Sequence, residues 1–232
     1  MSYRKVGCMI FMTLAASVSF SKTTNDELNE IVTNRIVWCE TKDQAMGWVR
    51  RATEKLHVSN ADIADSLTRF ISTNADARDG TSRSQACEMA IMVFADLAGL
   101  AQIQSLSRLA ERGTNMISRT AFFYFYTHET SDQAVHLAER LFDKPEIPSH
   151  YKGEVWRAVK YVNMHQKRDA AYTNAVVAFA RRQLERGCDL NACDTLLLKM
   201  DKRYEASDLR KLVLRMKANK DGRRNRGKET VR

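Results

Sequence analysis

Residues 85–97 read QACEMAIMVFADL, and this stretch decides the fold. Its apolar side chains cover nearly the whole circumference of a helix, which is typical of a helix buried on all sides. Before and after it, apolar residues recur at spacings of three and four, the period of helices that pack by one face. Two prolines and nine glycines in 232 residues supply few of the turns on which β-sandwiches and dinucleotide-binding folds depend. The sequence therefore predicts an all-α protein.

The same spacing predicts further helices along the chain. They cover residues 27–39, 44–56, 60–71, 100–112, 115–126, 131–142, 151–165, 169–186, 191–202 and 207–217. The connectors between them are short, so consecutive helices must pack as antiparallel neighbours. We expect stacked helical hairpins over residues 22–217, arranged as a short α-solenoid or as an irregular helical array.

A weak internal repeat supports this architecture. Arg83, Arg119 and Arg157 each stand at the front of an apolar helix, at separations of 36 and 38 residues. The segments SLTRFI, SLSRLAERG, HLAERLFDK and FARRQLERG are also alike. In this pattern residues 60–186 resemble HEAT-type repeats, in which each unit is two antiparallel helices, although the proline and the Asp-Val-Arg usual in that family are absent. The resemblance implies an extended surface for a protein or peptide partner.

The N-terminal segment has the layout of a secretory signal peptide. Arg4 and Lys5 precede an apolar run over residues 6–18, and small residues follow up to Ser21. The run is shorter than the roughly 20 residues that cross a bilayer. We expect a cleaved signal peptide over residues 1–21 and a periplasmic or extracellular protein, with a retained membrane anchor as the alternative.

Removal of this leader leaves four cysteines, an even number that suits an oxidising compartment. They are Cys39, Cys87, Cys188 and Cys193. We expect at least one disulfide, and the pair Cys188–Cys193 is favoured because both lie in the turn GCDLNACD. The alternative is that some of the four are buried as small apolar side chains. Their spacing, with no histidine nearby, does not match a zinc site, so no metal is expected.

The formal charge of +9 is concentrated at the C-terminus, where the last sixteen residues hold seven basic and two acidic groups. This segment has little apolar surface to bury, so we expect residues 218–232 to form a disordered basic tail. Arg223, Arg224 and Arg226 in this tail are candidate contacts to an anionic envelope surface. A tail that only aids solubility is the alternative, and we do not expect nucleic acid as the partner of an exported protein.

No motif in the sequence specifies a catalytic chemistry. Phosphate-binding loops, nucleophile elbows and zinc-protease helices are absent, so we assign no catalytic residue and no cofactor. His128 and His136, with Glu129 and Asp132 between them, are the one group that would form a metal or acid/base cluster if a hairpin brought it together. We expect surface and capping positions for these residues instead.

The densest aromatic run is Phe122-Phe123-Tyr124-Phe125-Tyr126. Five consecutive residues of a helix point in every direction, so we expect most of these rings to be buried between hairpins. Tyr124 or Tyr126 is the candidate to reach a groove and contact a partner. Three tryptophans follow the apolar periodicity and are expected in the core: Trp38, Trp48 and Trp156.

These observations together favour an exported, non-enzymatic helical-repeat protein that serves as a scaffold for a protein or peptide. The alternative is an exported all-helical hydrolase that acts on an envelope polymer. The two hypotheses differ in whether the histidines and carboxylates at residues 128–136 converge in a concave pocket.

Overall fold

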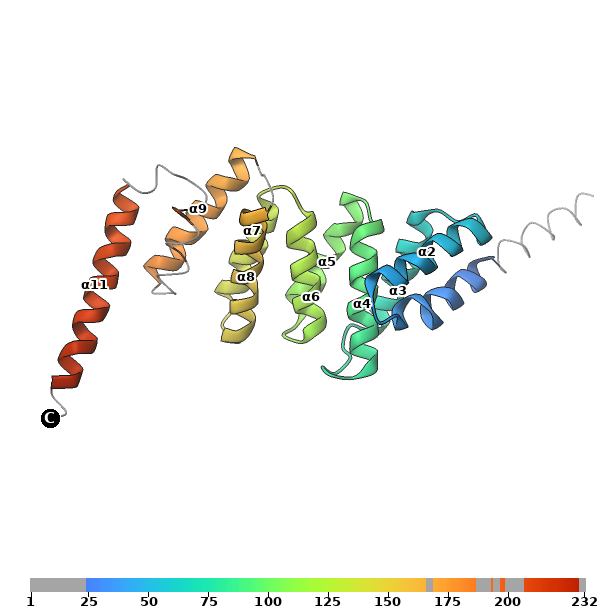
Figure 1. Cartoon of the computed structure of the whole chain (residues 1–232), viewed down its shortest axis with the longest axis horizontal. Helices are drawn as coiled ribbons and strands as arrows, with labels where there is room; N and C mark the ends of the chain where they lie inside the picture. The colour runs from blue at the N-terminus through green and yellow to red at the C-terminus, as the bar shows by residue number, and fades with distance from the viewer. Residues whose placement is uncertain (1–23, 166–168, 187–192, 194–196, 199–206, 230–232) are drawn as a thin grey trace, which may run out of the picture. The chain divides into compact units, whose positions relative to one another are not determined.

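The computed structural model describes residues 24–165, 169–186, 193, 197–198 and 207–229, and these residues contain helices and connectors but no strand (Figure 1). The prediction of an all-α fold is confirmed. A first helix spans residues 24–34. The elements that follow it are η1 (Ile36–Trp38), α2 (Lys42–Leu56), α3 (Asn60–Asn74), α4 (Ser82–Leu97), α5 (Leu100–Arg112), α6 (Met116–His128), α7 (Gln133–Asp143), α8 (Ser149–His165), α9 (Ala170–Glu185) and α11 (Asp208–Glu229).

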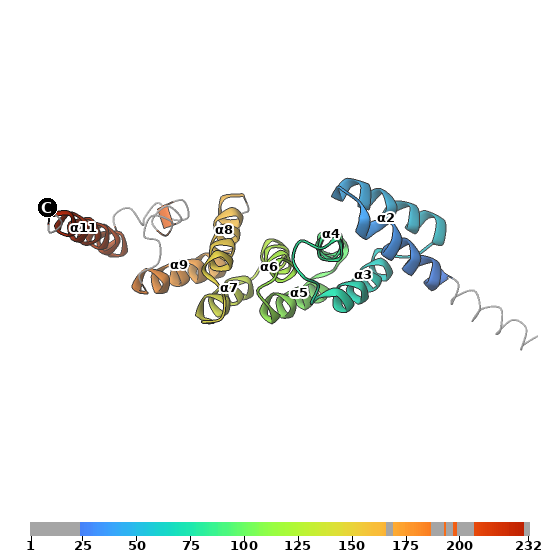
Figure 2. The same cartoon turned by 90° about the horizontal axis from the view of Figure 1, so that it is seen from below.

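The chain divides into two compact units, one that ends at Tyr124 and one that begins at Phe125. In the first unit, helices that follow each other in sequence pack against each other, and α3 and α4 form the most extensive pair. Figure 2 shows α3 and α5 in one layer of this unit and α4 in the other. The expected hairpin packing is therefore present.

Capping residues set the beginnings of these helices. The Thr41 side chain accepts a hydrogen bond from the Gln44 backbone N–H at the start of α2, and Thr81 accepts one from Ser84 at the start of α4. Each cap satisfies one of the backbone N–H groups that a helix leaves unpaired at its first turn. Gly80, directly before the α4 cap, has a φ of 78°, a left-handed conformation in which a side chain is strained.

Helix α4 is the buried helix that residues 85–97 predict. One narrow, less buried stripe runs along Gln85, Glu88, Met92 and Asp96. The buried residues cover the rest of the helix circumference: Ser84, Ala86, Cys87, Met89, Ala90, Ile91, Val93, Phe94 and Ala95. It contacts η1, α2 and α3. A helix with neighbours on several sides needs apolar residues around most of its circumference, which explains why the apolar surface of α4 is wider than a single stripe.

Alternate helices of the first unit are joined by polar contacts. Ser66 Oγ of α3 donates a hydrogen bond of 2.7 Å to the side chain of Asn29, in the first helix. Gln102 Nε2 of α5 donates one of 2.9 Å to Asp65 of α3. Both contacts join residues 37 positions apart, which is close to the separation of the sequence repeat. The repeat in the sequence thus corresponds to a repeated contact between helices.

The second unit is also built from packed helices. Helix α7 contacts both α8 and α9. Ion pairs join Glu139 to Arg182 and Asp143 to Arg186, so two successive turns of α7 face two successive turns of α9. An aromatic cluster of Phe142, Trp156 and Phe179 joins α7, α8 and α9, with ring centroids 5.4–6.3 Å apart.

The last helix is longer than the sequence predicts. Helix α11 continues to Glu229, well beyond residue 217, where the sequence analysis ends the last helix. Lys and Arg have high helix propensities, and Val213 of α11 is buried in a cluster with Ala180 and Leu184 of α9. This anchor explains how a polar helix forms here. Residues 230–232 and the side chains of Arg223, Arg224 and Arg226 lie outside the described part of the chain.

Candidate functional site

A cavity of about 630 Å³ lies between the first helix and α2. One face of each helix lines the cavity. The first helix and the residue after it contribute Glu30, Ile31, Asn34 and Arg35, and α2 contributes Trp48, Arg51, Glu54 and Lys55. Its volume lies within the roughly 300–1,000 Å³ of known ligand-binding pockets. The cavity is therefore large enough to hold a few side chains of a partner.

Trp48 lines this cavity together with two arginines. Its ring is half-buried, and the guanidinium carbons of Arg35 and Arg51 lie 5.6 and 4.8 Å from the ring centroid. A guanidinium at this distance from an indole is attracted by the negative face of the ring. The stacked guanidinium keeps its N–H donors at its edge, where they remain available to an acceptor.

The two arginines reach the ring from different elements. Arg51 is three residues after Trp48 on α2, so both project from the same face of that helix. Arg35 follows the first helix, and its φ of −128° interrupts the helical backbone before η1. The buried side chains of Ile36 and Val37 then hold η1 against the core. The break in the helix fixes the position from which Arg35 approaches Trp48.

The cavity is lined by three cationic and two acidic side chains. Among the residues that the structure describes, neither Arg35 nor Arg51 forms an ion pair. Glu30 and Glu54 in the lining are exposed. The lining therefore has an excess of positive charge, and the two cations against Trp48 can bind an anion.

Two smaller cavities are weaker candidates for a functional site. One of about 190 Å³ lies between α3 and α5 beside Arg108 and Arg112, and one of about 480 Å³ lies beside Asp62 and Asp65. Asp62 bonds to Ser59, and Asp65 accepts a hydrogen bond from Gln102. The two carboxylates of the second cavity thus already have partners in the fold.

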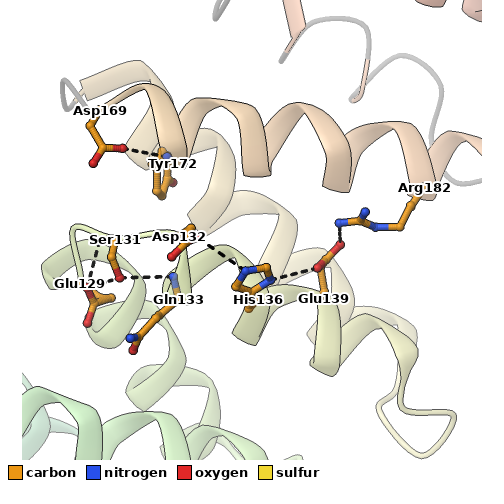
Figure 3. A network of polar contacts seen from close by, with 9 residues as sticks. All are labelled: Glu129, Ser131, Asp132, Gln133, His136, Glu139, Asp169, Tyr172 and Arg182. Atoms are coloured by element: carbon orange, nitrogen blue, oxygen red, sulfur yellow. Dashed lines mark hydrogen bonds and ion pairs between the residues drawn. The ribbon is translucent and has the colours of Figure 1, made fainter.

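The histidine and carboxylate group at residues 128–136 has structural roles (Figure 3). Glu129 is buried, and its Oε1 accepts hydrogen bonds from the backbone N–H of Ser131 at 2.9 Å and from Ser131 Oγ at 2.8 Å. His136 lies along α7, with Asp132 at 3.7 Å and Glu139 at 3.4 Å from its ring nitrogens. The Glu139 carboxylate also pairs with Arg182 of α9.

His128 lies at the end of α6, with Nδ1 3.1 Å from Thr127 Oγ1. Across the described residues, no group of three or more His, Cys, Asp or Glu side chains is close enough to hold a metal ion. The four residues at 128–136 therefore do not form the metal cluster that their spacing raised as an alternative.

The two candidate tyrosines have different environments. Tyr126 is fully buried, and its hydroxyl accepts a hydrogen bond from Tyr172, so its side chain does not reach a groove in this structure. Tyr124 is half-buried, near the ion pair between Lys42 and Asp96, and burial raises the pKa of its hydroxyl. Only Tyr124 of the two keeps an accessible edge.

Of the three tryptophans expected in the core, Trp156 packs against a buried cluster, and Trp38 departs from the expectation most. Trp38 is 51% exposed, and its indole N–H donates a hydrogen bond of 2.7 Å to the backbone carbonyl of Thr33. Trp48 and Trp156 are half-buried. Trp38 is exposed because residues 36–38 form a 3-10 turn rather than the end of a continuous α-helix, which changes the direction of its side chain.

The cysteines are placed as follows. Cys39, Cys87 and Cys193 are all reduced thiols; Cys39 is half-buried, Cys87 is buried, and Cys193 is buried in the cluster between α9 and α11. No disulfide joins the cysteines that the structure describes, and Cys188, the expected partner of Cys193, lies outside the described residues. The N-terminal leader, residues 1–21, also lies outside them.

No protein-family model matches this chain, and no curated protein or solved structure shows significant similarity to it. None of the described helices combines the length and apolar character that a membrane span requires.

Arg35, Arg51 and Trp48 were not predicted as a site from the sequence. Trp48 and Arg51 are three residues apart on a predicted helix, so the sequence indicates that they share a face. Trp48 was nevertheless expected in the core, because it follows the apolar periodicity. Arg35 gave no signal, because its approach to Trp48 depends on the break between the first helix and η1.

Proposed function

We propose that this protein is a non-enzymatic scaffold that binds a peptide segment of a partner protein in the cavity beside Trp48. The observation that carries the proposal is the half-buried indole with two arginines against it in a concavity of ligand size. Trp and Arg are the residue types most enriched among those that dominate binding energy at protein interfaces. A helical array with repeated hairpins provides a rigid support for such a site.

Three further features belong to this proposal. The hairpins form a HEAT-like array, which the contacts 37 residues apart support. The protein is exported through its N-terminal leader and works in the periplasm or outside the cell. Its basic C-terminal segment, with Arg223, Arg224 and Arg226, attaches it to an anionic envelope surface.

A display library of random twelve-residue peptides tests the peptide-binding proposal. The purified full chain is immobilised, and bound peptides are sequenced and then measured one by one. We expect peptides that bind the wild type and lose most of their affinity for a Trp48→Leu variant.

Arg50→Gln is the matched control, because Arg50 is an exposed α2 residue that does not line the cavity. It should leave binding unchanged. A library that yields no binder, or binders that are indifferent to Trp48→Leu, would contradict the proposal.

A further inference from the structure

We propose that the cavity beside Trp48 recognises an acidic peptide segment, in which one carboxylate is bound by Arg35 and Arg51 and a neighbouring apolar side chain rests against the indole. This inference rests on the proposed peptide-binding function and specifies the chemistry of the partner.

Two of the three cationic groups in the cavity lining are guanidinium groups, and the third is the ammonium of Lys55. Within the part of the chain that the structure describes, Arg35 and Arg51 have no ion-pair partner, although both lie against Trp48. A guanidinium presents its N–H groups in a planar fork that matches the two oxygens of a carboxylate. A carboxylate of the ligand can therefore accept the hydrogen bonds that these guanidinium groups do not make within the protein.

The ring of Trp48 orients these donors before a ligand arrives. Stacking on the indole restricts each arginine, so less side-chain freedom is lost when an anion binds. The half-buried ring and Ile31 also give the cavity an apolar surface beside the cations. A ligand that carries a carboxylate next to an apolar group satisfies both features, and acidic peptides have this composition.

Glu30 and Glu54 set a limit on the charge of the partner. Both are exposed carboxylates of the same lining, so they repel additional negative charge near the arginines. The site therefore suits a peptide with one carboxylate at the arginines and apolar neighbours rather than a dense polyanion. Removal of these two glutamates should increase the affinity for an acidic peptide. If the cavity residues only stabilised the fold, their removal would not increase this affinity.

The test measures fluorescence anisotropy of two labelled ten-residue peptides with the purified full chain. One contains a single Glu flanked by Leu residues in a Ser background, and the other has Gln in place of that Glu. We expect the acidic peptide to bind at least tenfold more tightly than its amide twin. We also expect this preference to weaken with added salt, because the contacts are ionic and partly exposed.

Four variants locate the binding. Arg35→Gln and Arg51→Gln should each weaken binding of the acidic peptide by about tenfold and leave the amide peptide little changed. The double variant Glu30→Gln, Glu54→Gln should bind the acidic peptide several-fold more tightly. Arg50→Gln removes one positive charge from the same helix outside the cavity and should change affinity by less than twofold. Circular dichroism melts establish that each variant is folded.

The outcomes separate this inference from the proposed function. Equal binding of the two peptides, with both lost in Trp48→Leu, would overturn the acidic preference and leave a peptide site. Equal losses in Arg50→Gln and Arg51→Gln would show diffuse charge attraction and overturn the site. Millimolar inorganic phosphate could displace the acidic peptide as efficiently as unlabelled peptide does. That result would overturn the inference, because the cavity would then be a general anion site. No binding of either peptide, together with an unproductive library, would remove both proposals.

Discussion

The hydroxyl of Tyr172 donates a hydrogen bond of 2.7 Å to the hydroxyl of Tyr126, and both side chains are fully buried. Their rings meet edge to face, with centroids 6.3 Å apart. The two residues are 46 positions apart, so the contact holds the start of α9 against the end of α6. A buried hydroxyl without a partner is costly, and each of these tyrosines supplies a partner for the other.

Tyr172→Phe should lower the free energy of unfolding by about 1–2 kcal/mol, because it removes the donor and leaves the Tyr126 hydroxyl with one partner fewer in a dry environment. The double variant Tyr126→Phe, Tyr172→Phe should be less destabilised than the sum of the two single variants. Urea unfolding of the four proteins gives this coupling energy.

Tyr161→Phe is the control for this cycle, since Tyr161 is 46% exposed, and it should change stability by less than about 0.5 kcal/mol. Strict additivity of the two buried substitutions would contradict the hydrogen bond.

Asp79 joins the loop before α4 to the start of α6. Its Oδ1 accepts a hydrogen bond of 2.7 Å from the backbone N–H of Met116, and its Oδ2 lies 3.3 Å from Arg119 Nη2. Asp79→Ala removes an acceptor from the first turn of α6 and a partner from Arg119, so unfolding should require about 1–2 kcal/mol less. Asp79→Asn keeps an acceptor and should cost less.

Asp76→Ala changes an exposed aspartate of the same loop and serves as the matched control. Its stability in guanidinium unfolding should stay within about 0.5 kcal/mol of the wild type. If both alanine variants behave alike, the Asp79 contacts contribute nothing to the folded state.

Much of the fold could be predicted from the sequence because the apolar periodicity is strong. Helix α5 has the predicted bounds, and α4 is buried where QACEMAIMVFADL indicates. The first helix is the exception. The sequence predicts one helix over residues 27–39, whereas the backbone leaves the helical conformation at Arg35 and continues as a 3-10 turn. No proline or glycine marks this break, so local propensity does not reveal it.

The candidate site was harder to predict for the same reason. Trp48 and Arg51 share a helix face, which spacing can show, but Arg35 reaches them only because the chain turns after residue 34. Tyr126 shows the opposite difficulty. Its place in a run of five aromatic residues did not indicate which rings face the core, because that depends on where α9 packs.

The capping box of α3 should make stability depend on pH. Ser59 Oγ and its backbone N–H donate hydrogen bonds of 2.7 and 2.8 Å to Asp62 Oδ2. These bonds, the side-chain one first, lower the pKa of the Asp62 carboxyl in the folded state. The stabilisation is therefore complete above the ordinary aspartate pKa of about 3.9 and is lost as the pH falls through the lower folded value.

Asp62→Ala should accordingly destabilise the protein by about 1 kcal/mol at pH 7, and the difference from the wild type should shrink below about pH 4. Urea unfolding at a series of pH values measures it. Asp43→Ala is the control, because it removes a carboxylate from the first turn of α2, where the structure describes no capping box that involves Asp43. This variant should show a smaller effect. A deficit of Asp62→Ala that stays constant down to pH 2 would contradict the carboxylate's role.

The thiols should differ sharply in reactivity. Burial, together with the neighbouring Glu88 charge, raises the pKa of Cys87 to about 12, and its side chain is fully enclosed by the core of the first unit. Burial also raises the pKa of Cys39, but that side chain is half-buried and its Sγ donates to the Arg35 carbonyl at 3.3 Å, near the surface. Thiolates are the reactive form, so at pH 8 only about one Cys87 in ten thousand is reactive even where a reagent reaches it.

Iodoacetamide at pH 8 should therefore alkylate Cys39 in the native protein and spare Cys87, with peptide mass spectrometry as the readout. In guanidinium chloride both should react at similar rates, because unfolding removes the burial that raises the two pKa values. If Cys188 and Cys193 form the expected disulfide, neither reacts in denaturant until a reductant is added. Native labelling of Cys87 as fast as that of Cys39 would mean that the interior around α4 opens readily, and would contradict the close packing on which the hairpin fold depends.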